Sequence, residues 1–346
     1  MIWLSWRQFR TQAIVAGSVL AVLAILLLST GFGLAHLYHV SGLAGCQAKH
    51  SCHNALALFS SGLRGSVYEF VFYIAIGLIY LGPALIGAFW GAPLVAREVE
   101  TGTLRLAWSQ SVSRSRWLIV KIAMLGLAGM AMTGLLSLML YWWSQPAYEA
   151  AALARPDTGL SISRLTPLLF GTNGVAPLGY AAFAFAVGLA ASVLIKRTLP
   201  AMAVTLAIVG LVLIAWPNWV RPHLITPVQS TVALRAQSVE GLSISSHAIS
   251  LIVGANRPSS WVLSDMAVNS AGRPYTGPPT HACAAVSQSY QDCINSIIAL
   301  HLKEAISFEP ASRFWALQGY EAGTYLLLAV VLAAACTWWI NRRRLA

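Results

Sequence analysis

Residues 97–117 read REVETGTLRLAWSQSVSRSRW and lie between two long apolar segments. The stretch contains four arginines, and a lysine follows it at position 121. Leu104, Trp108 and Val112 are spaced four apart, so they share one face of a predicted helix. A basic, amphipathic segment between two membrane spans is expected to contact either a cytoplasmic partner or the lipid headgroups.

The composition is that of a membrane protein. The chain has 346 residues, of which 57% are hydrophobic and only 10% are charged, and its mean hydropathy is +0.67. A soluble domain has roughly 25% charged residues, so this chain cannot cover its surface with polar groups. The net charge of +11 is typical of basic residues on the cytoplasmic side, so no nucleic-acid partner is expected.

The sequence predicts an all-α polytopic membrane protein with six transmembrane helices, because six apolar runs approach or exceed the roughly 20 residues needed to span a bilayer. An amphipathic interfacial helix is expected over residues 1–12. Residues 13–216 are expected to form the first five spans, and the coupling loop lies within them at 96–116. A large external loop domain follows at 217–319, and the sixth span with a basic tail at 320–346. The expected spans are Ala13–Leu37, Val67–Val95, Trp117–Tyr141, Val175–Ile195, Leu199–Trp216 and Tyr320–Ile340.

The charge distribution predicts that both termini are cytoplasmic. In this orientation the cytoplasmic side carries 12 basic and two acidic residues, whereas the other side carries 10 basic and nine acidic residues. The expected location is a bacterial plasma membrane. Residues 38–66, 142–174 and 217–319 are then external. The last of these is long enough to fold as a small domain, and Ile294–Ile306 has a helical pattern.

Four of the five cysteines lie in the predicted external regions, where thiols oxidise. The expected disulfides are Cys46–Cys52 and Cys283–Cys293, and Cys336 is expected to be a small core residue. A Cys/His metal site is the alternative in the first loop, although the spacing matches no closed zinc pattern. The residues behind this alternative are His36, His39, Cys46, His50, Cys52 and His53.

The chain lacks the motifs of an enzyme. None of its four lysines follows a glycine, so there is no phosphate-binding loop, and it has no zinc-protease or nucleophile-elbow motif. Glu69, Lys121 and Glu321 are expected near span ends, where they reach the interface. A coupled carrier needs intramembrane ionisable groups and a channel needs a filter, so both classes are disfavoured. Energy for any transport must come from another subunit.

Residues 97–104, 111–114 and 117–121 resemble the cytoplasmic loop between spans two and three of type-2 class ATP-binding-cassette (ABC) exporter permeases. In that family an E-x-G-T-L motif is followed by P/S-V-S-R and by a lysine that opens span three. Residues 309–315 and 338–344 are similar to the actinobacterial branch of these permeases.

The resemblance implies a non-catalytic subunit that pairs with a second permease copy or a paralogue in membrane lipid. Each permease is then expected to dock on a separate cytoplasmic ABC ATPase subunit, which binds ATP and Mg while this chain holds no cofactor or metal. Anchoring on lipid headgroups is the alternative role of the loop. The expected docking residues are Glu98, Glu100, Thr101, Gly102, Leu104, Arg105, Trp108, Val112 and Arg114.

Tyr73, Tyr80 and Gly87 recur every seven residues along the second span, and Gly87 opens a Gly-x-x-x-Gly pattern that allows close helix approach. The resemblance implies that spans two and five line a cavity at the dimer seam, so these residues and Phe89 are substrate-cavity candidates. Ordinary helix packing is the alternative. An uncharged lining favours export of a hydrophobic or amphipathic drug, peptide or lipid-like molecule. The alternative function is a non-transporting sensor or immunity module that binds a peptide or antibiotic outside.

Overall fold

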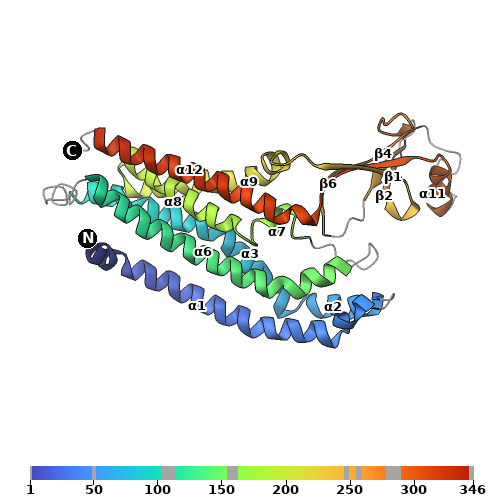
Figure 1. Ribbon diagram of the computed structural model, residues 1–346, viewed down its shortest axis with the longest axis horizontal. Helices are drawn as coiled ribbons and strands as arrows, with labels where there is room; N and C mark the ends of the chain where they lie inside the picture. Colours follow the sequence, from blue (N-terminus) through green and yellow to red (C-terminus); the bar gives the residue numbers. More distant parts are fainter. Residues whose placement is uncertain are drawn as a thin grey trace.

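The computed structural model describes residues 2–48, 52–102, 114–153, 163–244, 249–254, 259–277 and 290–342. It is an elongated molecule in which a bundle of long helices carries a strand domain at one end (Figure 1). Both chain termini lie at the opposite end. We call these two ends of the bundle the domain end and the termini end.

The described residues include six helical segments that are long and apolar enough to cross a membrane, which confirms the predicted number of spans. The second segment contains a π-helical turn, η2, and continues after it as the short helix α4. The helices that form the six segments are α1 (Ile2–Val40), α3 (Val67–Ile86) with η2 (Gly87–Gly91) and α4 (Pro93–Glu100), α6 (Arg114–Leu153), α8 (Ala176–Ile195), α9 (Thr198–Trp219) and α12 (Phe314–Arg342).

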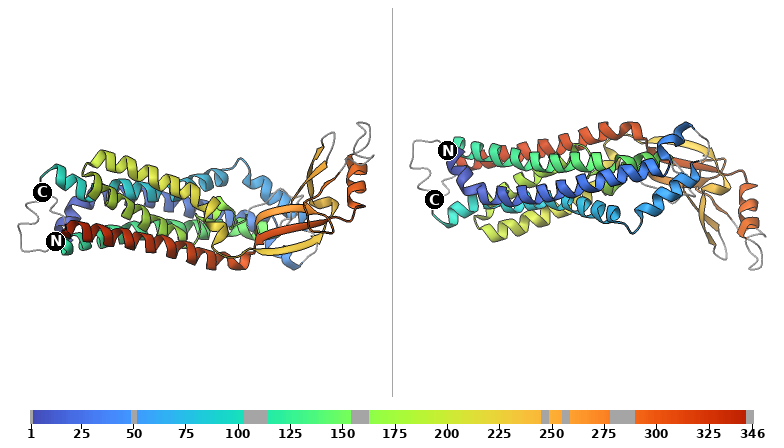
Figure 2. Two further views of the ribbon diagram at one scale, coloured as in Figure 1. Left: turned by 90° about the horizontal axis from the view of Figure 1, so that it is seen from above. Right: turned by 90° about the horizontal axis from the view of Figure 1, so that it is seen from below.

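Helix α8 is the centre of the bundle. It packs against α3, α6, α9 and α12, and most of its side chains are buried. A helix that is apolar all round is expected in such a position, since it has no polar face to turn toward water. The other spans are more exposed, and their outward side chains are aliphatic or aromatic, as expected of surfaces that contact lipid. The views in Figure 2 show the long helices running side by side.

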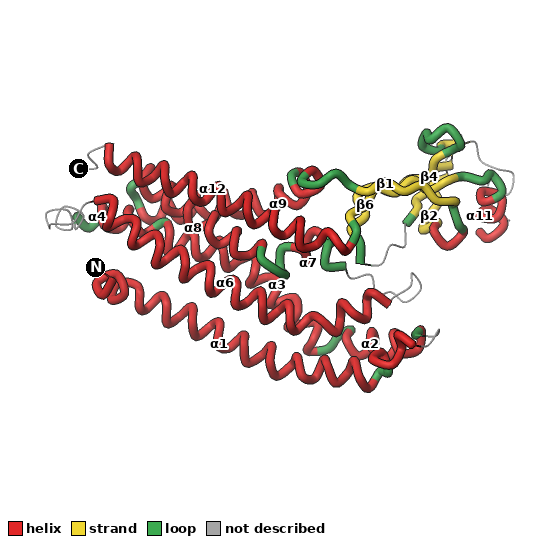
Figure 3. Tube along the Cα trace, viewed as in Figure 1, coloured by secondary structure: helices red, strands yellow, loops and turns green. Residues whose placement is uncertain are grey.

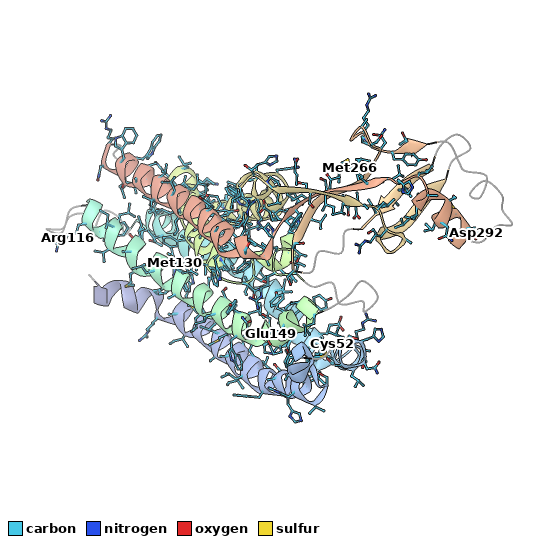
Figure 4. All side chains as sticks on the ribbon, turned by 45° about the vertical axis from the view of Figure 1, so that its right-hand side comes forward. Cys52, Arg116, Met130, Glu149, Met266 and Asp292 are labelled. Carbon is cyan, nitrogen blue, oxygen red and sulfur yellow. A yellow bond between two sulfur atoms is a disulfide. The ribbon has the colours of Figure 1, made fainter. Side chains whose placement is uncertain are left out.

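Helices α1 and α6 are longer than the spans expected from the sequence. Figure 4 labels Arg116, Met130 and Glu149 along α6, from the termini end to the domain end. A helix of 40 residues is about 60 Å long, whereas the hydrocarbon core is about 30 Å thick, so α6 is longer than a single crossing requires. The predicted amphipathic helix at residues 1–12 is not a separate element, because residues 2–12 form the first turns of α1.

Short helices cover the domain end of the bundle. They are η1 (Leu43–Ala48), α2 (His53–Leu63) and α7 (Pro167–Phe170). Cys46 and Cys52 form the predicted disulfide between η1 and α2, with their Cα atoms 5.6 Å apart. Cys293 is also disulfide-bonded, and its predicted partner Cys283 lies outside the described residues. Cys336 is a buried free cysteine, as expected.

The domain at the far end contains two antiparallel three-stranded sheets, which Figure 3 shows in yellow beside the red helices. One has the order β1-β6-β4, and the other has the order β2-β3-β5. Strand β1 pairs with β6 from Val228 opposite Phe308 to Ala233 opposite Lys303. The elements here are η4 (Arg221–His223), β1 (Val228–Ala233), η5 (Ala236–Ser238), β2 (Val239–Ile244), β3 (Ile249–Val253), β4 (Trp261–Val268), β5 (Thr276–Gly277), α11 (Tyr290–Ile298), β6 (Lys303–Glu309) and η6 (Ala311–Arg313).

These strands qualify the all-helical expectation, which holds for the membrane part of the chain. The helical pattern expected over Ile294–Ile306 is wrong in its second half, where β6 begins at Lys303. Glu304 and Ile306 are buried while Lys303 is exposed, so the segment has the two-residue alternation of a strand. Because α11 and β6 are separated by only a few residues, their two apolar patterns merge into one apparent helical pattern in the sequence.

Candidate coupling site at the termini end of the bundle

The site is formed around α4, the short helix that leads into residues 103–113. A π-turn precedes it, in which the Ala92 amide donates to the Gly87 carbonyl at 2.9 Å, five residues back. Pro93 then begins α4 at a position that needs no amide donor. Single π-turns inside α-helices are frequent at functional sites, because they reorient the helix that follows.

Glycines bring the π-turn against the backbone of α8. A Cβ atom at Gly87 would lie 2.4 Å from the Ala184 carbonyl oxygen, and one at Gly188 would lie 2.1 Å from the Gly87 carbonyl oxygen. Only glycine allows such an approach. The close helix contact predicted from Gly87-x-x-x-Gly91 is therefore present, and its partner is α8. Gly188 was missed by sequence reasoning, because a lone glycine in an alanine-rich helix is a weak signal.

Ser192 on α8 makes the first polar contact with α4. Its Oγ accepts hydrogen bonds from the backbone amides of Val95 at 3.0 Å and Ala96 at 2.8 Å. The π-turn and Pro93 disturb the regular pattern of amide bonding here, and a buried amide without an acceptor is costly. Ser192 thus satisfies two backbone donors of a different span. No sequence signal identified it, since a serine in an apolar helix is common.

An ion pair makes the second contact, between α4 and α6. Lys121 Nζ lies 2.5 Å from Glu98 Oε1, and the two side chains are 9% and 14% exposed. The ammonium also lies 4.3 Å from the centroid of the Trp117 ring. Lys121 lies near the start of its span, as expected, and the structure adds its pairing with Glu98. The pairing with Glu98 compensates the desolvation that would otherwise drive the lysine outward.

Glu100 makes the third contact, with the start of α9. Its carboxylate accepts hydrogen bonds from the Thr198 amide at 3.0 Å and from the Thr198 hydroxyl at 2.6 Å. A carboxylate is favoured at a helix N-terminus because it satisfies free amides and matches the helix dipole. In all, α4 is bonded to α8, α6 and α9 through Ser192, Lys121 and Thr198.

A cavity of about 340 Å³ lies beside α4 and is also bordered by α1 and α6. Phe9 of α1 packs edge-on against Trp90, with ring centroids 4.5 Å apart, and both line this cavity. Arg97 and Glu98 give it charged walls. The first turns of α1 are therefore placed next to α4.

Five of the nine predicted docking residues lie within the described residues. Glu98, Glu100, Thr101 and Gly102 lie together at the end of α4, where Gly102 has φ +71° and ends the helix in a left-handed turn. Arg114 begins α6, and its side chain lies outside the described part of the structure. Leu104, Arg105, Trp108 and Val112 lie outside the described residues.

The four substrate-cavity candidates do not share one surface. The Tyr80 hydroxyl donates to the Leu168 carbonyl at 2.7 Å, and Gly87 is buried against α8. Tyr73 and Phe89 are 60% and 46% exposed. A seven-residue spacing drifts around a helix, and the π-turn adds a further rotation before Phe89.

A second polar cluster lies at the domain end and was missed by sequence reasoning. Arg221 Nε lies 2.7 Å from Glu321 Oε2, Arg221 Nη2 lies 2.9 Å from Glu321 Oε1, and both side chains are fully buried. The Tyr180 hydroxyl donates to the same carboxylate. The expectation that Glu321 reaches the interface is therefore wrong. Since α9 ends before Arg221, no charge pattern within one span revealed the pair.

Further contacts hold Arg221 in place. Its Nη1 donates to the Pro167 carbonyl at 3.0 Å, and the guanidinium lies 4.3 Å from the centroid of the Phe170 ring. Burial lowers the pKa of the guanidinium, but the hydrogen bonds and charge of Glu321 outweigh this and raise the pKa above its usual value. The arginine therefore stays charged at every physiological pH.

Six apolar helical segments that are long enough to cross a membrane identify the chain as a polytopic membrane protein. The family model described as ABC-2 membrane transporter related matches residues 17–221, which is more than half of the chain. The chain therefore belongs to this family, whose members are membrane permeases of ABC transporters. No curated protein and no solved structure matches the chain.

Proposed function

We propose that this chain is the membrane-spanning subunit of an ATP-driven exporter, and that a separate ABC ATPase subunit docks at the termini end of the bundle. The ATPase binds ATP and Mg, and this chain transmits its movement to the spans. The proposal places both termini in the cytoplasm of a bacterial cell and the strand domain outside the plasma membrane. The family membership and the excess of basic residues near the termini support it.

The observation that carries this proposal is the set of three contacts made by α4. This helix leads directly into the amphipathic segment around Leu104 and Trp108, and its last turns are bonded to three other spans. A force applied to the segment therefore acts on α6, α8 and α9 at once. An element that only anchored the chain to lipid headgroups would need no such contacts.

The outward surfaces of α3 and α9 support pairing with a second permease and transport of an apolar cargo. The two helices pack against each other, and each exposes an apolar stripe. Neither stripe contains a charged residue, so it fits a partner helix or a hydrophobic or amphipathic substrate. The stripes include Phe70, Leu81 and Leu85 on α3 and Leu206, Leu211 and Ile214 on α9.

The test begins with purification of the chain from its native membrane and identification of the proteins that copurify. We expect an ABC ATPase in stoichiometric amount. Leu104→Asp and Trp108→Ala should then release it or abolish substrate-stimulated ATP hydrolysis, because an apolar interface anchor contributes about 2 kcal/mol or more.

Trp219→Ala is the matched control, since this tryptophan is 74% exposed at the domain end of the bundle. It should leave both ATPase recovery and ATP hydrolysis unchanged. Full hydrolysis and full ATPase recovery in both Leu104→Asp and Trp108→Ala would contradict docking through this segment.

A further inference from the structure

A cavity of about 370 Å³ lies at the domain end, between α1, α2, α3, α6 and the segment around α7. It is separate from the cavity beside α4 at the termini end. Its volume is within the range of roughly 300–1,000 Å³ that binds small ligands. Of the residues predicted to contact substrate, Tyr73 lines it.

The inner walls of this cavity are apolar and rigid. Leu34, Trp143 and Tyr148 line it and are between 0% and 5% exposed, so tertiary packing fixes their positions. Phe72 stacks on Trp143, with ring centroids 5.8 Å apart and planes inclined by 19°. Such walls fit an alkyl chain, because they offer a large contact area and little polar surface.

The mouth of the cavity carries one charge of each sign. Arg64 is exposed directly after α2, and Glu69 lies in the first turn of α3. The turn between them is fixed, because Gly65 has φ +66° and its amide donates to Glu69 Oε2 at 2.6 Å. The cation and the anion are therefore presented together at one edge of the cavity.

The mouth of the cavity lies at the depth in the membrane that a lipid headgroup occupies. The apolar span of α3 begins at Val67, between Arg64 and Glu69, so the two charges lie where the hydrocarbon region ends. Tyr73, one turn further along α3 than Glu69, and Leu168 also border the cavity, and they are 60% and 56% exposed. A molecule with its polar group at Arg64 and Glu69 can thus insert its chain past Tyr73 and Leu168.

We propose that this cavity binds one phospholipid with a zwitterionic headgroup, taken from the membrane leaflet at the domain end. One acyl chain lies against Phe72, Trp143 and Tyr148. The headgroup phosphate pairs with Arg64 and its ammonium pairs with Glu69. A lipid with an anionic headgroup matches only Arg64 and meets repulsion from Glu69. Binding needs no transport, so this inference stands or fails apart from the proposed function.

The experiment uses the purified full chain and native mass spectrometry with added phosphatidylethanolamine or phosphatidylglycerol of equal chain length. Wild type should bind phosphatidylethanolamine more tightly. Ala147 lines the cavity, and Ala147→Phe fills part of it, so we expect loss of the bound lipid. The matched control is Ala335→Phe on the exposed face of α12, which should bind lipid as wild type does.

Two charge variants test the headgroup without changing the cavity. Arg64→Gln should weaken binding of phosphatidylethanolamine about fivefold, the effect of one basic residue near a membrane surface. Glu69→Gln should shift the preference toward phosphatidylglycerol, since the repelling carboxylate is gone. Retention of the lipid by a folded Ala147→Phe variant would overturn the site. The headgroup assignment would be overturned if wild type bound the two lipids equally tightly and Glu69→Gln did the same. This outcome can be measured even if Ala147→Phe does not fold.

Discussion

At the domain end, Arg221 and Glu321 form an ion pair with no exposed side-chain surface, whereas at the termini end Lys121 and Glu98 form one that borders a cavity. Both pairs join different helical segments of the bundle. Around Glu321 both carboxylate oxygens are bonded, while Glu98 Oε2 is buried without a hydrogen-bond partner among the described residues. In the Arg221–Glu321 pair, both carboxylate oxygens are hydrogen-bonded, so the pair has a structural role. In the Lys121–Glu98 pair, one carboxylate oxygen can still accept a hydrogen bond after a rearrangement or from a partner.

This difference agrees with the expected roles of the two ends. A fully desolvated and fully bonded pair strongly resists separation, because either charge alone would remain buried. It connects α12 to the segment that enters the strand domain, together with Tyr180 of α8. The Lys121–Glu98 pair has one hydrogen bond and is partly exposed, which agrees with the proposed docking of an ATPase on α4. Each of the following variants tests this contrast.

The largest effect is expected from breaking the domain-end pair. Glu321→Gln and Arg221→Met should each lower the free energy of unfolding by about 3–5 kcal/mol, because each leaves an uncompensated buried charge or donor. Chemical unfolding in mixed micelles measures this effect. The double variant Arg221→Met/Glu321→Leu should recover much of the loss. Single variants with near wild-type stability would show that this pair does not hold the helices together at the domain end.

The next effect concerns the glycine contact between η2 and α8. Gly188→Ala should lower the free energy of unfolding by about 1–3 kcal/mol, because the added Cβ would overlap the Gly87 carbonyl oxygen. Gly77→Ala is the control, since a Cβ there meets nothing within 4 Å. It should be neutral or slightly stabilising, as expected for glycine in a helix. Equal stability of the two variants would contradict a rigid contact at η2.

A smaller loss of stability, but a large loss of coupling, is expected at the termini end. Glu98→Gln and Lys121→Met should each cost about 1–2 kcal/mol, between the values for exposed and fully buried pairs. Both should reduce substrate-stimulated ATP hydrolysis in the complex. The control is Arg313→Met, which breaks the 3.1 Å pair with Glu309 far from α4. If this control reduced stimulation equally, the termini-end pair would have no special part in coupling.

The smallest effect on stability is expected at the contact between Glu100 and α9. Thr198→Val removes the hydroxyl donor but keeps the backbone amide that also bonds the carboxylate. Because this contact is exposed to solvent, we expect no measurable change in unfolding. Stimulated ATP hydrolysis should still fall, since α4 loses a bond to α9. Unchanged hydrolysis would limit coupling to the contacts with α6 and α8.

The sequence predicted the parts of the site that depend on local pattern. The Gly87-x-x-x-Gly91 spacing indicated close helix packing. The sequence could not predict Ser192, Lys121 or Thr198 as partners of α4, since each comes from a different span. Tyr73 and Tyr80 share a seven-residue spacing, yet only their tertiary neighbours place one on the surface and bond the other to a carbonyl group.

The amino-acid sequence by itself determined that the chain spans a membrane six times, and its local motifs identified the segment at the termini end. These properties depend on the length of apolar runs, on the positions of arginine and lysine and on glycine spacing, all of which are local in the chain. Only the tertiary structure decided that Arg221 pairs with Glu321 across 100 residues and that α8 is the centre of the bundle. It also decided that the domain between the last two spans forms sheets. These features depend on which distant segments bury each other's polar groups, and no local pattern encodes that choice.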